Sequence, residues 1–180
     1  MPDLCSFPEI TAADVELVGG KGLSLGLMAA AGLPVPPGFC ITSTAYRQAS
    51  GQRLSPPLSE ALARAYQTLG AGCVAVRSSA TAEDGAEASF AGQQETILGV
   101  EGEVALYESV ERCWRSLHTE RAIADRQKQG VDEPGRAMAV VVQRLIHAEV
   151  AGVLFTRDPM DATGDRMLVE ASWEIGRAHV

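Results

Sequence analysis

Two short segments of the sequence combine positive charge with small residues, a combination suited to binding phosphate. Gly19-Gly20-Lys21-Gly22 precedes apolar residues at helical spacing, so Lys21 is expected at or just before the N-terminus of a helix. Backbone N–H groups at a helix start attract anions, and a lysine adds a point charge. The segment is not a Walker A loop, because Gly-x-x-x-x-Gly-Lys-[Ser/Thr] is absent. A flexible helix cap with a solvated lysine is the alternative interpretation of this segment alone.

The second segment begins at Arg77, which ends a predicted strand and is followed by serines and a threonine. A guanidinium group donates two parallel hydrogen bonds and suits phosphate recognition, with an ordinary ion pair as the alternative. Residues 78–93 then show neither helical nor strand periodicity, and long irregular segments of compact domains are often functional. Gly92, within the small-residue stretch 88–94, would permit a turn in a lid over a ligand. A surface loop without function is the alternative.

A glutamine inside an apolar strand is the third candidate. Gln143 lies within the predicted strand Met138 to Ile146, and a buried amide must find hydrogen-bond partners. An adenine edge would serve, and so would a neighbouring strand. The histidines are less promising as phosphoryl carriers. His118 is expected on or near the surface of a helix, His147 follows a strand, and neither lies in a Gly/Thr-rich turn.

The late carboxylates leave two interpretations open. Asp158, Asp161 and Asp165 could bind a metal ion, but a turn between two strands fits them better. Glu170 is a single acidic residue in a predicted strand, and it would either contact a ribose or a metal shell, or face solvent. No residue is assigned as a metal ligand or as a catalytic group.

The composition restricts the class of protein. The chain has 180 residues, 15 Lys+Arg against 23 Asp+Glu and a net charge of −8, which argues against nucleic acid or an anionic membrane as partner. No apolar run approaches the roughly 18 residues of a membrane span. Four widely spaced cysteines lack zinc-binding spacing, and apolar surroundings predict buried free thiols for three of them, which fits a reducing cytoplasm: Cys40, Cys73 and Cys113.

Helices and strands would position these residues. The predicted helices and strands alternate in the first part of the chain and strands cluster at its end, which predicts a mixed α+β fold. Helices are expected after Gly22, from Leu58 to Leu69 and from Val104 to Arg126. Thr42 or Ser43 can cap a short helix. Strands are expected at Phe39–Thr42, Cys73–Arg77, Thr96–Val100, Met138–Ile146, Val150–Thr156 and Met167–Ala171.

The order of these segments resembles one known family. It is similar to the N-terminal ATP-binding domain of the pyruvate phosphate dikinase / phosphoenolpyruvate synthase family, and the joint at Gly32–Phe39 looks most like rifampicin phosphotransferase-like proteins. The similarity runs from about Leu17 to Trp173. It is carried by Leu17–Gly22, Gly32–Phe39, Val76–Asp84, Ala88–Thr96, Val142–Arg144, Gly152–Pro159 and Glu170–Trp173.

The resemblance implies an ATP-grasp-like nucleotide-binding fold, incomplete at the C-terminus, over residues 1–173, with lobes at about 1–100 and 101–173. ATP and Mg²⁺ would be the cofactors of the full-length enzyme. ATP would phosphorylate a distant histidine, which passes the phosphoryl group to pyruvate or to an antibiotic hydroxyl. The implied roles are phosphate contacts for Lys21 and Arg77, the phosphate-covering loop for Gly92 and Thr96 with Ile97 adjacent, and the adenine contact for Gln143.

The sequence departs from the family pattern in several ways. The segment between Tyr46 and Arg77 is short, because the family usually carries a longer helical insertion there. The family's later carboxylates and glutamine, its phosphohistidine domain and its acceptor domain are expected beyond Trp173. Residues 174–180 can be encoded by the start of a common sequencing adapter, which predicts a non-native tail. A non-catalytic nucleotide-binding module and an inactive gene fragment are therefore the alternative functions.

Overall fold

The computed structural model describes residues 2–50, 53–80, 95–119, 137–158, 160–161 and 166–173. The chain forms two compact units, Met1–Leu145 and Ile146–Val180, and each is described by itself. The expected lobes at about 1–100 and 101–173 stay a prediction, and strands on both sides of residue 100 join one sheet. Gly92 and the tail 174–180 lie outside the described residues.

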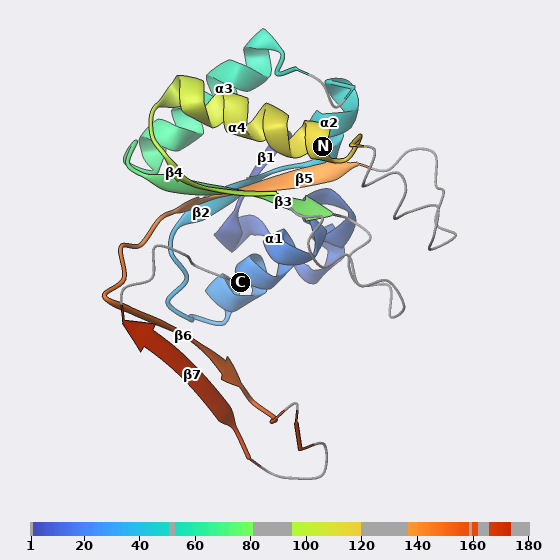
Figure 1. The fold of residues 1–180 in the computed structure, drawn as a ribbon. Coiled ribbons are helices and arrows are strands. Elements are labelled where there is room, and N and C mark those ends of the chain that lie inside the picture. The colour runs from blue at the N-terminus through green and yellow to red at the C-terminus, as the bar shows by residue number, and fades with distance from the viewer. Residues whose placement is uncertain are drawn as a thin grey trace. The chain divides into compact units, whose positions relative to one another are not determined.

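A five-stranded antiparallel sheet forms the centre of the first unit (Figure 1). Its central strand β5 is apolar along its whole buried part, as expected for a strand covered on both faces. In the order β1-β2-β5-β3-β4, the strands are β1 (Leu4–Ser6), β2 (Gly38–Ile41), β5 (Met138–Arg144), β3 (Val74–Ala80) and β4 (Thr96–Val100).

Helices cover both faces of this sheet (Figure 1). Helix α1 (Val15–Ala30) lies on one face, and α2 (Ser43–Gln48), α3 (Pro56–Thr68) and α4 (Glu103–Ser116) lie on the other. Strand residues alternate between the two cores. Val141 packs with Val18 and Cys40 under α1, whereas Val140 and Val142 pack into the larger core under α2, α3 and α4. The first unit is therefore a three-layer arrangement, with α1 on one face of the sheet and α2, α3 and α4 on the other.

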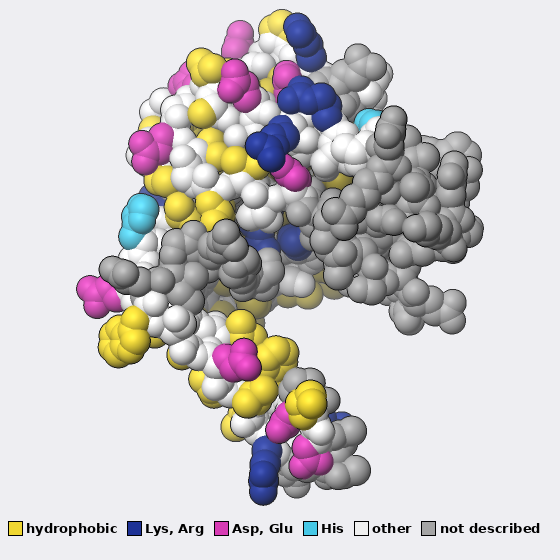
Figure 2. Space-filling view, in the orientation of Figure 1, with side chains coloured by type: hydrophobic (Ala, Val, Ile, Leu, Met, Phe, Trp, Pro, Cys, Tyr) yellow, Lys and Arg dark blue, Asp and Glu magenta, His cyan; other side chains and the backbone are white. Residues whose placement is uncertain are grey.

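The second unit contains one antiparallel pair, β6 (Val150–Phe155) and β7 (Leu168–Trp173). Apolar side chains of this hairpin face solvent (Figure 2), including Leu154 at 57% exposure and Trp173 at 79%. Within the described residues, no helix is both long enough and apolar enough to span a membrane.

The predicted α+β fold class is confirmed. The predicted strands all form, β4 with the expected bounds, and Thr42 caps α2 by accepting a hydrogen bond from the Ala45 amide at 3.3 Å. Strand β1 and the 3-10 turns Phe7–Glu9 and Ala12–Asp14 were not predicted, because three-residue elements carry no measurable periodicity.

Candidate nucleotide-binding site

Helix α1 is divided at Gly19, where φ is +68° and the helical geometry is interrupted. Lys21 therefore lies in the first turn of the helical segment after the break, consistent with the predicted helix start. A Cβ atom on Gly19 would lie 2.4 Å from Ser79 Oγ and 2.5 Å from the Ser79 carbonyl oxygen. Only glycine permits both this backbone conformation and this close approach of the helix to strand β3.

Ser79 joins the two sides of this break. Its hydroxyl donates to the Val18 carbonyl at 2.8 Å and accepts from the Gly22 amide at 3.3 Å. One buried hydroxyl thus ties both segments of α1 to β3. Ser78 is also fully buried, and its hydroxyl donates to the Glu95 carbonyl at 3.3 Å. The hydroxyls after Arg77 were expected to suit phosphate recognition, but both serines hold the backbone together instead.

Arg77 and Thr96 are direct partners across the β3–β4 pair. Residues opposite each other in an antiparallel pair point to the same face of the sheet, and so do residues two apart on one strand. Ser79 contacts α1, so Arg77 and Thr96 lie on the α1 face as well. Arg77 is half-buried, and Thr96 is exposed. The structure thus places the predicted arginine and threonine together, on the face that carries the helix start with Lys21.

Ile97 is separated from this group by the alternation of the strand. It pairs with Val76, and its side chain packs against the core under α2, α3 and α4. Any part that Ile97 takes in a site with Arg77 and Thr96 therefore falls to its backbone.

Gln143 lies on the α1 face too, two residues from Val141. It is opposite Ala75 on one side and Gly38 on the other. Its side-chain Nε2 donates to the Pro36 carbonyl oxygen at 3.1 Å. Because a carbonyl only accepts, this contact orients the amide and directs Oε1 away from Pro36. The partner is thus the connector before β2.

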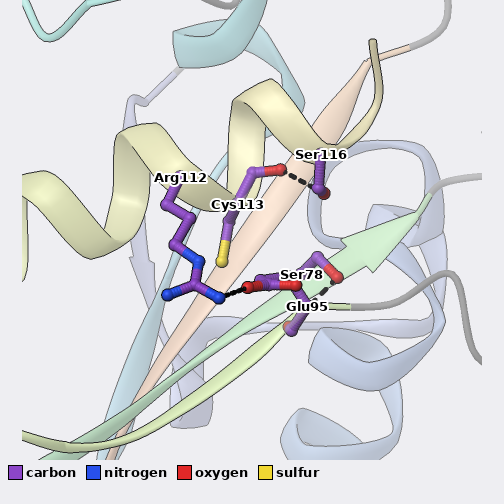
Figure 3. Close-up of polar contacts among 5 residues, drawn as sticks. All are labelled: Ser78, Glu95, Arg112, Cys113 and Ser116. Atoms are coloured by element: carbon purple, nitrogen blue, oxygen red, sulfur yellow. Dashed lines mark hydrogen bonds and ion pairs between the residues drawn. The ribbon is translucent and has the colours of Figure 1, made fainter. Parts of the chain in front are cut away.

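Charged side chains gather where β4 begins (Figure 3). Glu95 forms an ion pair with Arg112 of helix α4. Burial, the largest cause, and the Glu95 carboxylate raise the pKa of the neighbouring Cys113 thiol to about 12, against smaller opposing effects of Arg112 and Lys21. The sequence analysis did not identify Glu95 or Arg112 as a pair, because nothing in the sequence indicates that these two distant charged residues come together.

All four cysteines are free thiols. Cys40 and Cys113 are buried as predicted, whereas Cys73 is only partly buried. Burial raises the pKa of Cys40 to about 12 as well, so neither buried thiol supplies a thiolate nucleophile near neutral pH.

The remaining titratable candidates have structural roles or exposed positions. His118 Nε2 hydrogen-bonds to the Tyr46 hydroxyl at 2.8 Å, and His147 is exposed in the second unit. Asp158 Oδ1 accepts from the Met160 amide at 2.8 Å, which fits the turn interpretation, and Glu170 is exposed. Within the described ranges, no three His, Cys, Asp or Glu residues gather in a way that could hold a metal ion.

These features define an α+β domain with a candidate phosphate-binding helix start. The sequence matches the family described as "Pyruvate phosphate dikinase, AMP/ATP-binding domain" over residues 15–53 and 49–180. The chain therefore belongs to this family, whose domains have an ATP-grasp-like nucleotide-binding fold, as the resemblance implied.

Curated relatives carry two kinds of name. The chain is 40% identical to a probable phosphoenolpyruvate synthase of Methanocaldococcus jannaschii, over 96% of the chain and 18% of that protein. It is 39% identical to a rifampicin phosphotransferase of Streptomyces sviceus, over 96% of the chain and 24% of that protein. A phosphoenolpyruvate synthase of Aeropyrum pernix is 38% identical, over 93% of the chain and 26% of that protein. The chain thus spans about a quarter or less of these relatives.

The alignments also locate a difference within the matched region. They extend over 214 and 210 residues for the first two relatives, although the chain has 180, so the relatives carry residues that this chain lacks. The two matched segments of the family meet at residues 49–53, between helices α2 and α3. This junction lies within the short Tyr46–Arg77 segment noted in the sequence.

Proposed function

We propose that this chain binds ATP, with its phosphates at the α1 helix start and its adenine beside Gln143. The observation that carries the proposal is the placement of Arg77 and Thr96 on the α1 face, where the helical segment containing Lys21 begins. Membership of an AMP/ATP-binding family supports it. Gly92 and Ile97 would complete the site, Gly92 through the covering loop and Ile97 through its backbone.

Each proposed phosphate contact has a distinct physical basis. The positive end of the helical segment that begins after Gly19 attracts an anion. Lys21 adds a mobile positive charge, whereas Arg77 offers a planar fork of donors that matches phosphate oxygens. Thr96 opposite Arg77 adds a hydroxyl donor. Together they would neutralise part of the charge on the triphosphate.

The proposed contact between Gln143 and the base predicts a preference for adenine over guanine. The Pro36 carbonyl takes one of the two N–H donors of the Gln143 amide, and Oε1 is the acceptor proposed to meet the purine. An adenine N6 amino group would donate to this oxygen. A guanine has a carbonyl oxygen at the same ring position, and two acceptors would then face each other. We therefore expect ATP to bind better than GTP.

Mg²⁺ is proposed to accompany ATP, where it would neutralise charge on the β- and γ-phosphates. The described residues offer no cluster of metal ligands, so no side chain of this chain is assigned to hold the ion. The proposed role of the chain itself is therefore nucleotide binding.

In the full-length protein, we propose that the bound ATP supplies a phosphoryl group to a histidine on another domain. The acceptor would then be pyruvate or an antibiotic hydroxyl, the two chemistries suggested by the relatives' names. A cytoplasmic location and an absence of nucleic-acid or membrane partners are part of the same proposal. A non-catalytic nucleotide-binding module is the second candidate, favoured by the hydrogen bond that occupies His118.

Isothermal titration with ATP, GTP and adenosine, with and without Mg²⁺, tests the binding proposal. Lys21→Ala or Arg77→Ala should each weaken ATP binding by about 1.5–3 kcal/mol, the range for hydrogen bonds to charged groups. Adenosine binding should change little, because adenosine has no phosphates. Equal losses for ATP and adenosine would instead indicate misfolding and contradict the assigned roles.

Incubation with γ-labelled ATP and Mg²⁺ separates binding from turnover. We expect no acid-labile phosphoprotein above the level of the Lys21→Ala variant, because His118 is engaged by Tyr46 and no metal ligands are assigned. Labelling of His118 or His147 above that level would make the chain a kinase in its own right.

A further inference from the structure

The ion pair between Glu95 and Arg112 joins the start of β4 to helix α4 (Figure 3). Glu95 immediately precedes Thr96, one of the two side chains placed together on the α1 face. Its own carboxylate reaches the opposite side of the sheet, where α4 lies, because successive strand residues alternate. The pair therefore contacts the site only through the backbone.

The backbone of Glu95 is held independently on its other side. Its carbonyl oxygen accepts from the Ser78 amide at 2.9 Å and from the Ser78 hydroxyl at 3.3 Å. Ser78 immediately follows Arg77. The residues next to Arg77 and Thr96 are thus bonded to each other, and the Arg112 guanidinium ties this junction to a helix that packs on the sheet.

The exposure of the Glu95–Arg112 ion pair indicates that folding stability is not its main role. The Glu95 side chain is 28% exposed and that of Arg112 is 64% exposed, a range in which an ion pair adds little to folding stability. The backbone hydrogen bonds between Glu95 and Ser78 place this ion pair directly beside the backbone of Thr96 and Arg77.

We propose that Arg112 is a positioning residue for the nucleotide site: by pairing with Glu95 it holds the β3–β4 junction and keeps Thr96 opposite Arg77. This inference rests on the proposed function. A positioning role and a purely structural role predict different measurements. Loss of a positioning residue should change exchange at the β3–β4 junction and the binding of ATP, whereas loss of a structural residue should lower the melting temperature.

The test uses the full chain with Arg112→Ala and a matched control, Arg115→Ala. Arg115 lies on the same helix and pairs with Glu111 at 3.5 Å, with similar exposures of 59% and 22%. Both variants remove one positive charge, but Glu111 is not bonded to the β3–β4 junction in any described contact. Hydrogen exchange at the Ser78 amide reports the junction, and titration with ATP and adenosine reports the site.

With Arg112→Ala, we expect several-fold faster exchange at the Ser78 amide and about threefold to fivefold weaker ATP binding, the upper range for one exposed ion pair. Adenosine binding, the melting temperature and the Arg115→Ala variant should match the unmodified chain. Arg112→Lys should restore much of the loss. Glu95→Gln, which removes the same ion pair from its other end, should give similarly faster exchange at Ser78 and a similar loss of ATP affinity.

Unchanged exchange at Ser78 in Arg112→Ala would overturn the inference, and so would equal losses of ATP and adenosine. The two proposals fail separately. If the unmodified chain binds no ATP, the proposed function is wrong, and the exchange measurement still decides whether Arg112 holds the strand pair. If the chain binds ATP and Arg112→Ala binds it equally well, only the positioning role is wrong.

Discussion

Strands β5 and β6 are similar in length and apolar character but differ in burial. In β5, residues Met138–Val142 are all buried, and Val142 is 0% exposed. In β6, Leu154 is 57% exposed and Phe155 is 40% exposed. The difference lies in the layers around each strand, since helices cover both faces of the β5 sheet. An apolar strand therefore stabilises a fold only to the extent that another layer removes it from water.

The hairpin of the second unit carries apolar residues on both of its faces. By the register, Val150, Leu154 and Trp173 share one face, and Val153, Phe155 and Leu168 share the other. A two-stranded hairpin alone is at best marginally stable in water. We therefore expect the first unit to determine the stability of the chain.

The two tryptophans of the chain provide the strongest test of this difference. Trp114 is fully buried in the core under α2, α3 and α4, whereas Trp173 on β7 is 79% exposed. Trp114→Ala should lower the free energy of unfolding by about 3–5 kcal/mol, and Trp173→Ala by less than about 0.5 kcal/mol. Urea unfolding followed by far-ultraviolet circular dichroism measures both. Similar losses for the two variants would contradict the comparison.

Gly19 in the first unit and Gly152 in the second allow the two units to be compared by substitutions that affect the backbone. A Cβ on Gly19 would lie 2.4 Å from Ser79 Oγ, and a Cβ on Gly152 would lie 2.4 Å from the Glu170 carbonyl oxygen. Gly19→Ala should cost about 3 kcal/mol, since it adds overpacking to a left-handed backbone position. Gly152→Ala should disturb the hairpin but leave the main unfolding transition in place.

Gly32→Ala separates the two contributions at Gly19. Gly32 also has a positive φ, +76°, but nothing lies within 4 Å of an added Cβ. Its cost should be only that of the backbone conformation, about 1–2 kcal/mol. Thermal unfolding of the three alanine variants measures the differences, and a Gly19 variant no worse than the Gly32 variant would show that α1 can move away from β3.

The sequence predicted the local elements well and the contacts between distant segments poorly. Thr96–Val100 was predicted as a strand that resumes regular structure after the irregular segment, and the structure has a strand with the same bounds. The strand order, by contrast, depends on pairings such as Arg77 with Val141, which local periodicity does not specify. The same holds within the site, where Lys21, Arg77 and Gln143 were identified by type, but the Ser79 link and the Glu95–Arg112 pair were not.

The smallest predicted effect concerns two carboxylates that cap short turns before α1. Glu9 accepts from the Ser6 hydroxyl at 2.6 Å and from the Ser6 amide at 2.8 Å, and Asp14 accepts in the same way from Thr11. These hydrogen bonds lower the pKa of each carboxyl below its ordinary value, which is 4.5 for Glu9 and 3.8 for Asp14. The hydrogen bond from the side-chain hydroxyl has the larger effect and the one from the backbone amide the smaller.

The sign of the pH dependence follows from these lowered pKa values. The folded chain binds the proton more weakly than the unfolded chain, so the stabilisation is fully present above the ordinary pKa values and is lost as the pH falls through the folded ones. Glu9→Gln should therefore lower the melting temperature slightly at pH 7, and this difference should shrink as the pH falls through the lowered pKa of Glu9. Asp158→Asn, which alters a comparable turn contact in the second unit, should leave the main transition unchanged over the same pH range. A constant difference between Glu9→Gln and the unmodified chain across this range would show that the ionised carboxylate contributes nothing to the cap.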